Sequence, residues 1–97
     1  MNYNQLVNSS DVVMVEFYAS WCPHCQHMMP IVAQIKQLLV GKVEIYQLDI
    51  DQNVQTAEAE GASSVPTFII YKNGKEQWRQ SGEMDAQVLL SKIESYL

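Results

Sequence analysis

The most informative segment of this sequence is Phe17-Tyr18-Ala19-Ser20-Trp21-Cys22-Pro23-His24-Cys25. It begins inside an apolar, β-branched run, residues 12–19, which is typical of a strand covered on both faces in an α/β sheet. It then leads into a helical pattern over residues 23–40, and the proline at the start suits a first helical turn. Two cysteines three residues apart are therefore expected where a buried strand passes into a helix.

The first cysteine is expected at the helix N-terminus. Free backbone N–H groups and the helix dipole favour a negative charge there, which lowers the pKa of a thiol and favours the nucleophilic thiolate. Cys25 follows Cys22 by one turn, close enough to form a disulfide with it or to attack one that it holds. His24, when protonated, is expected to stabilise the Cys22 thiolate further. Cys22 and Cys25 are the candidate catalytic residues.

Glu16 is an ionisable residue inside the apolar strand, six residues before Cys22. Burying an unpaired charge is costly, so its pKa is expected to lie above the usual range. A carboxyl group poised in this way could transfer the proton of Cys25. The alternative is that the long Glu16 side chain simply reaches solvent.

The rest of the chain continues the alternation of helices and strands. The patterns predict a short helix over 2–8, strands at 43–49, 66–71 and 76–81, and helices over 54–60 and from 85 onward. Asn73-Gly74 predicts a tight hairpin between the last two strands. This order predicts an α/β fold with a mixed sheet and helices on both faces. The core-facing side of the helix over 23–40 is expected to carry Met28, Ile31, Ile35, Leu38 and Leu39.

Length and composition set further bounds. The 97 residues are enough for a single domain, residues 1–97, and 47% hydrophobic with 18% charged residues is an ordinary globular composition. Eleven acidic against six basic residues, a net charge of −5, disfavour nucleic acid and anionic membranes as partners. No apolar run of membrane-spanning length occurs. If Met1 is the natural start, the absence of a leader pattern predicts a cytoplasmic protein.

Several short motifs in the same order and spacing make the chain resemble the thioredoxin family from about Val12 to Leu97. They are Val15-Glu16-Phe17-Tyr18-Ala19-Ser20-Trp21-Cys22-x-x-Cys25, Pro30, Asp49-Ile50-Asp51-Gln52-Asn53, Val65-Pro66-Thr67-Phe68, Lys72-Asn73-Gly74 and Gly82.

The resemblance implies a thioredoxin fold and a thiol-disulfide oxidoreductase that acts on protein disulfides with no cofactor or metal of its own. It also implies a cis Val65-Pro66 bond beside the dithiol, and a backbone at Val65 that pairs with the substrate. The implied substrate groove is lined by Trp21, Pro23, Val65, Pro66 and Gly82. A thioredoxin reductase is the implied electron donor, and a monomer is the family's usual state.

Three departures from the family pattern carry expectations of their own. Pro23-His24 stands where thioredoxins have Gly-Pro, and it resembles the periplasmic dithiol oxidases. Their potential lies near −120 mV against about −270 mV for thioredoxin, so an intermediate, more oxidising potential is expected. Gln47 stands where a buried lysine is common, which should raise the pKa of Glu16 further. The short N-terminus leaves no room for the family's first strand, so four strands are expected.

Other interpretations remain open. The cysteines could form a merely structural disulfide, or they could bind zinc together with His24 and His27, although four donors within six residues are unusually crowded. Pro23-His24 favours, as the enzymatic alternative, a disulfide oxidase or isomerase of an oxidising compartment. The non-enzymatic alternative is a binding adaptor that uses the groove beside Pro66 without turnover.

Overall fold

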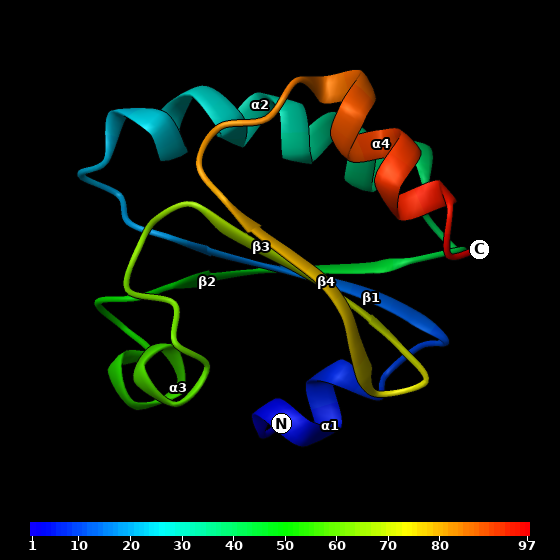
Figure 1. Cartoon of the computed structure of the whole chain (residues 1–97), viewed down its shortest axis with the longest axis horizontal. Coiled ribbons are helices and arrows are strands. Elements are labelled where there is room, and N and C mark those ends of the chain that lie inside the picture. The colour runs from blue at the N-terminus through cyan, green and yellow to red at the C-terminus, as the bar shows by residue number, and fades with distance from the viewer.

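A central sheet with helices on both faces forms the fold of the chain, and the computed structural model describes all of residues 1–97 (Figure 1). The elements follow the predicted order. They are α1 (Tyr3–Val7), β1 (Val12–Tyr18), α2 (Pro23–Leu38), β2 (Glu44–Asp49), α3 (Val54–Ala59), β3 (Thr67–Lys72), β4 (Lys75–Ser81) and α4 (Ala86–Glu94). None of these helices is both long enough and apolar enough to cross a bilayer.

The sheet has four strands in the order β2-β1-β3-β4. β1 pairs parallel with β2 and antiparallel with β3, and β3 pairs antiparallel with β4. The expected mixed four-stranded sheet is therefore confirmed. Asn73 and Gly74 connect β3 to β4 with φ values of 52° and 79°. Both lie in the left-handed region that a tight hairpin turn requires, which explains the Asn-Gly pair.

The alternation of side chains along β1 divides the interior into two cores. Val12 and Met14 belong to the core beneath α2 and α4, whereas Val13, Val15 and Phe17 belong to the core on the side of α1 and α3. Figure 1 shows these helix pairs on opposite faces of the sheet. Because successive side chains point to opposite faces, Glu16 lies on the α2/α4 face, in line with Met14.

The core-facing side of α2 differs from the expectation at two positions. Leu38 is expected to be buried but is 67% exposed, and Val32 is buried instead. Met28, Val32, Ile35 and Leu39 follow one another at spacings of four, three and four, which keeps them on one stripe of a 3.6-residue helix. Leu38 lies to the side of that stripe and faces solvent.

Candidate active site

Cys22 occupies the N-cap of α2, and Pro23 is its first residue. Cys22 has extended backbone angles. Its carbonyl accepts the N–H of Gln26 at 3.0 Å, and this hydrogen bond forms the first turn of the helix. Cys25 lies one turn later and is fully buried, and both cysteines are free thiols. The expected placement of the two sulfurs, at the start of a helix and one turn inside it, is confirmed.

The two thiols differ in acidity. The pKa of Cys22 lies below its usual value, chiefly because the backbone N–H of Cys25 hydrogen-bonds to its sulfur, and the Cys25 side chain and the His24 backbone N–H contribute as well. Burial raises the pKa of Cys25 to about 11, although the Ala19 N–H donates to its sulfur at 3.5 Å. The site therefore holds one thiol that ionises more readily than an ordinary cysteine, and one that keeps its proton at neutral pH.

Glu16 is a fully buried carboxyl group in the same region of the molecule. It lies opposite Gln47 across β1–β2 and opposite Phe68 across β1–β3. Its Oε1 accepts a hydrogen bond from Gln47 Nε2 at 2.9 Å, and its Oε2 has no partner. Burial raises its pKa above the usual range, as expected, and the Gln47 bond opposes this only in part. The alternative that this side chain reaches solvent is wrong.

The charge of Glu16 acts on Cys25. The negative charge of Glu16 is one of the causes that raise the pKa of Cys25. A carboxylate near a thiol disfavours the thiolate as long as it is ionised, and it becomes a proton acceptor when the thiol must lose its proton. The arrangement can therefore retain the proton of Cys25 and later remove it.

The loop before β3 lies against the first cysteine. The Val65-Pro66 bond is cis, as the resemblance implied, and the Cys22 thiol donates to the Val65 carbonyl at 3.7 Å. Pro66 is buried, and its carbonyl accepts the N–H of Gly82 at 2.8 Å. Gly82 has a φ of +98°, a backbone conformation that favours glycine. Three expected groove residues from distant parts of the chain are thus brought together beside Cys22.

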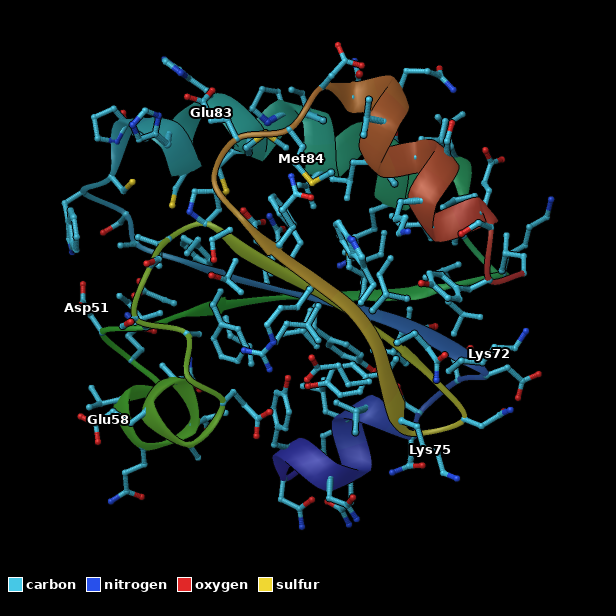
Figure 2. All side chains as sticks on the ribbon, in the orientation of Figure 1. Asp51, Glu58, Lys72, Lys75, Glu83 and Met84 are labelled. Atoms are coloured by element: carbon cyan, nitrogen blue, oxygen red, sulfur yellow. The ribbon has the colours of Figure 1, made fainter.

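The remaining expected groove residues, Trp21 and Pro23, are exposed next to Cys22. Trp21 is 64% exposed, and its indole Nε1 donates to Asp51 Oδ2 at 2.9 Å. Sequence reasoning did not single out Asp51 by itself, although it lies within one of the motifs of the resemblance. Figure 2 shows Lys72 and Lys75 at the opposite end of the molecule from Asp51.

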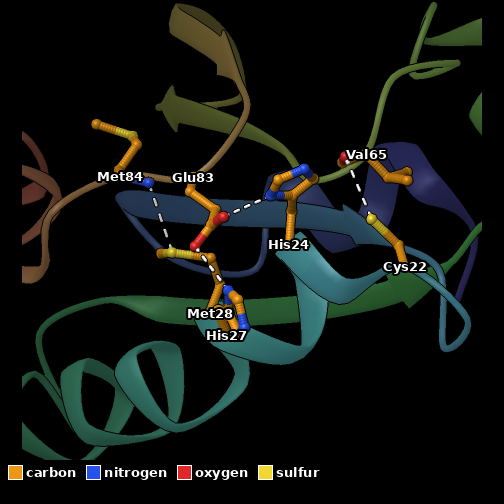
Figure 3. Close-up of polar contacts among 7 residues, drawn as sticks. All are labelled: Cys22, His24, His27, Met28, Val65, Glu83 and Met84. Carbon is orange, nitrogen blue, oxygen red and sulfur yellow. Dashed lines mark hydrogen bonds and ion pairs between the residues drawn. The ribbon is translucent and has the colours of Figure 1, made fainter.

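Glu83 is the residue of this region that sequence reasoning missed. Its Oε2 contacts Nδ1 of His24, and its Oε1 lies 3.2 Å from Nδ1 of His27, so one carboxylate bridges two successive turns of α2 (Figure 3). The hydrogen bond with His24 is the main reason that the pKa of Glu83 lies below its usual range. The one sequence feature that could have pointed to Glu83 is its position directly after Gly82, an expected site residue.

The donors that could have formed a zinc site point in different directions. The histidines turn toward Glu83, whereas Cys22 faces the Val65 carbonyl (Figure 3). No group of three or more His, Cys, Asp or Glu side chains has the arrangement of a metal site.

Comparisons with known proteins agree with this geometry. A family model described as Thioredoxin matches residues 1–95. The thioredoxin of Synechocystis sp. is 36% identical over 92 residues, which cover 95% of this chain and 86% of that protein. The thioredoxin of Rickettsia prowazekii is 34% identical over 90 residues, with coverages of 93% and 86%. The chloroplastic thioredoxin Y of Oryza sativa is 36% identical over 99% of this chain, but the chain spans only 58% of its length.

Solved structures give the same result for the fold. A mutant thioredoxin from Halobacterium salinarum superposes with a TM-score of 0.87 at 31% identity, covering 96% of this chain and 80% of that one. The oxidised thioredoxin of Plasmodium falciparum superposes with a TM-score of 0.83 at 28% identity, with coverages of 97% and 88%. These neighbours share the arrangement of sheet and helices described above.

Proposed function

Because the chain belongs to the thioredoxin family of thiol-disulfide oxidoreductases, we propose that it reduces disulfide bonds of protein substrates through Cys22 and Cys25. The observation that carries this proposal is the difference between two thiols one helical turn apart. The acidic thiol is N-terminal and lies against the Val65 carbonyl, and the thiol with the raised pKa is fully buried one turn later. A sequential attack by two sulfurs needs this order of reactivity.

In the first step, the Cys22 thiolate attacks one sulfur of the substrate disulfide. A bond forms between Cys22 and that sulfur, the substrate S–S bond breaks, and the departing substrate thiolate takes a proton from solvent. The Val65 carbonyl lies 3.7 Å from the Cys22 sulfur, so a substrate backbone that pairs with Val65 would bring its disulfide to this atom. Trp21, Pro23, Pro66 and Gly82 would flank the same segment.

In the second step, Cys25 loses its proton and attacks the Cys22 sulfur. The mixed disulfide breaks, the second substrate thiolate leaves, and the Cys22–Cys25 disulfide forms. Two electrons have then passed from the dithiol to the substrate. We assign the uptake of the Cys25 proton to Glu16, acting through a bridging water, because it is a buried carboxyl whose charge acts on Cys25.

The finer proposal is a potential more oxidising than that of ordinary thioredoxin. Its basis is the Pro23-His24 pair, since a charge that stabilises the reduced thiolate makes the disulfide a stronger oxidant. His24→Pro is expected to lower the reduction potential in equilibration with glutathione. An unchanged potential would remove His24 from this proposal.

The partners and the location are proposals as well. Oxidised enzyme must be reduced again, and a thioredoxin reductase is the proposed donor. The protein is proposed to act as a monomer, which sedimentation would test. The cytoplasmic location stays a prediction, because some of the relatives are named as chloroplastic proteins.

Reduction of insulin disulfides with dithiothreitol as electron donor tests the central proposal. The wild-type protein is expected to accelerate insulin precipitation, and Cys22→Ser is expected to abolish the acceleration. Absence of turnover in the wild type would favour the adaptor interpretation.

A disulfide oxidase is the second candidate, and Pro23-His24 is the observation that favours it. Its chemistry is the same sequence of exchanges run in reverse, with a substrate dithiol as electron donor. The measured reduction potential of the Cys22–Cys25 pair distinguishes the reductase from the oxidase. A value near that of the periplasmic oxidases would favour the oxidase.

A further inference from the structure

Glu83 holds a fixed position above the first two turns of α2. The residue before it, Gly82, donates its N–H to the Pro66 carbonyl at 2.8 Å. The residue after it, Met84, is buried, and its N–H donates to the sulfur of Met28 at 3.5 Å (Figure 3). Both backbone neighbours are thus anchored independently of the Glu83 side chain, and the carboxylate is directed at the histidines of α2.

The histidine that Glu83 engages is the one between the two cysteines. An imidazolium at this position would stabilise the Cys22 thiolate if its charge were free to act on the sulfur. In the structure its Nδ1 is paired with a Glu83 oxygen. The other Glu83 oxygen is held by His27, one turn farther along the helix. The carboxylate therefore cannot turn away from His24 without losing a second contact.

We propose that Glu83 is a positioning residue that holds the His24 ring, withholds the positive charge of the protonated ring from Cys22, and so makes the dithiol less oxidising than Pro23-His24 alone would make it. This inference rests on the proposed function, because it concerns the redox balance of the same cysteine pair. Glu83 touches neither cysteine sulfur nor substrate in this scheme, and its main effect on the dithiol passes through His24.

Glu83 also has a smaller, direct effect on Cys22. Its negative charge opposes ionisation of that thiol, whereas the contribution of His24 to the thiol comes from its backbone N–H. The side chains of the His24–Glu83 pair are both partly exposed, so water and salt weaken the interaction. A modest adjustment of the redox equilibrium is therefore expected, and a large change in fold stability is not.

The experiment is a double-mutant cycle of wild type, Glu83→Gln, His24→Ala and the double variant. Each is equilibrated with glutathione buffers that contain a metal chelator. Glu83→Gln is expected to lower the equilibrium constant for oxidation by glutathione disulfide by roughly two- to fivefold, the size of one surface charge interaction. In the His24→Ala background the same substitution is expected to have less than half of this effect on a logarithmic scale.

Two further measurements complete the test. Glu94→Gln removes an exposed carboxylate at the end of α4 and controls for net charge, and its equilibrium constant is expected to match the wild type. Titration of the Cys22 thiolate by ultraviolet absorbance should show ionisation at lower pH in Glu83→Gln, which a merely structural role would not produce.

The proposal is overturned if Glu83→Gln leaves the equilibrium constant unchanged or raises it. An equal effect with and without His24 also overturns it, since Glu83 would then act directly on Cys22. These outcomes are separate from a failure of the proposed function, because equilibration with glutathione requires no protein substrate. If the protein reduces insulin but the double-mutant cycle shows no effect of Glu83, only the proposed role of Glu83 is rejected.

Discussion

At the residue scale, Glu16 is the costliest side chain of the interior. It is fully buried, one of its oxygens has a single hydrogen bond from Gln47, and the other oxygen has none. An unsatisfied buried polar group costs about 1–3 kcal/mol, and more when it is charged. A packed apolar side chain would avoid this cost, so the carboxyl group at this position is consistent with a chemical role.

The burial of Glu16 predicts a specific dependence of stability on pH. Below the ordinary range of glutamate, near pH 4, the group is protonated in both the folded and the unfolded chain. At higher pH the unfolded chain releases this proton while the buried carboxyl, with its raised pKa, retains it. The free energy of unfolding therefore falls as pH rises, until the folded-state pKa is passed.

Glu16→Gln isolates this contribution because all other titrating groups remain. The variant is expected to become more stable relative to wild type as pH increases from about 4, by at least about 1 kcal/mol at the plateau. Urea denaturation at a series of pH values measures the difference. A difference that stays constant with pH would mean that Glu16 titrates normally in the folded protein.

The role of Glu16 in proton transfer makes a kinetic prediction. Glu16→Ala is expected to slow release of the mixed disulfide by roughly 10²-fold or more, the usual size of general-base catalysis, with a smaller effect on the first attack. Stopped-flow measurement of the two steps separates them. Glu44→Ala, at an exposed glutamate of β2, is the matched control and should change neither step. Equal slowing of both steps by Glu16→Ala contradicts the assignment.

At the scale of the element, the N-terminus of α2 gives the two cysteines their different chemistry. Cys22 as N-cap faces the free N–H groups of the first turn, and the N–H of Cys25 is the main cause of its lowered pKa. Cys25 lies inside the helix and the core, where burial dominates. A displacement of one helical turn thus separates a reactive sulfur from a protected one.

This arrangement predicts a two-step titration of the reduced protein. Thiolate absorbance should show one ionisation below the ordinary cysteine value of about 8.5, and a second near pH 11. Cys22→Ser is expected to remove the first step and to move the second to lower pH, because Cys22 is one of the causes that raise the pKa of Cys25. A wild-type protein whose first thiol titrates at about 8.5 would contradict the activation of Cys22 by the helix.

At the scale of the whole molecule, the two cores share the same central strands. β1 and β3 each contribute side chains to the core under α2 and α4 and to the core beside α1 and α3. Phe17 and Phe68 are fully buried on opposite faces of this shared sheet. Loss of packing on one face must therefore weaken the support of the other.

Phe17→Ala and Phe68→Ala test this coupling. Each is expected to lower the free energy of unfolding by about 3–5 kcal/mol, the usual cost of removing a buried phenylalanine. Both variants should still unfold in one transition, with coincident curves from circular dichroism and tryptophan fluorescence. Separate midpoints for the two probes would show that the faces unfold independently.

Much of the site could be predicted from the sequence because its causes are local. An apolar run followed by Cys22 and Pro23 places a thiol at a helix start, whatever the helix packs against. Glu16 inside an apolar strand indicates burial for the same reason. The order of strands and helices, with the Asn73-Gly74 turn, was sufficient to predict the mixed four-stranded sheet.

Other features depended on how the elements pack. Leu38 fits the periodicity of α2 only loosely, and its exposure depends on where the sheet and α4 contact the helix. The contact between His24 and Glu83 joins residues 59 positions apart. The chain's local pattern determined which sulfur ionises, because backbone amides of one turn act on it. Only the tertiary structure determined that the Glu83 carboxylate lies beside that turn. Glu83 belongs to the segment between β4 and α4, which meets α2 only in the folded chain.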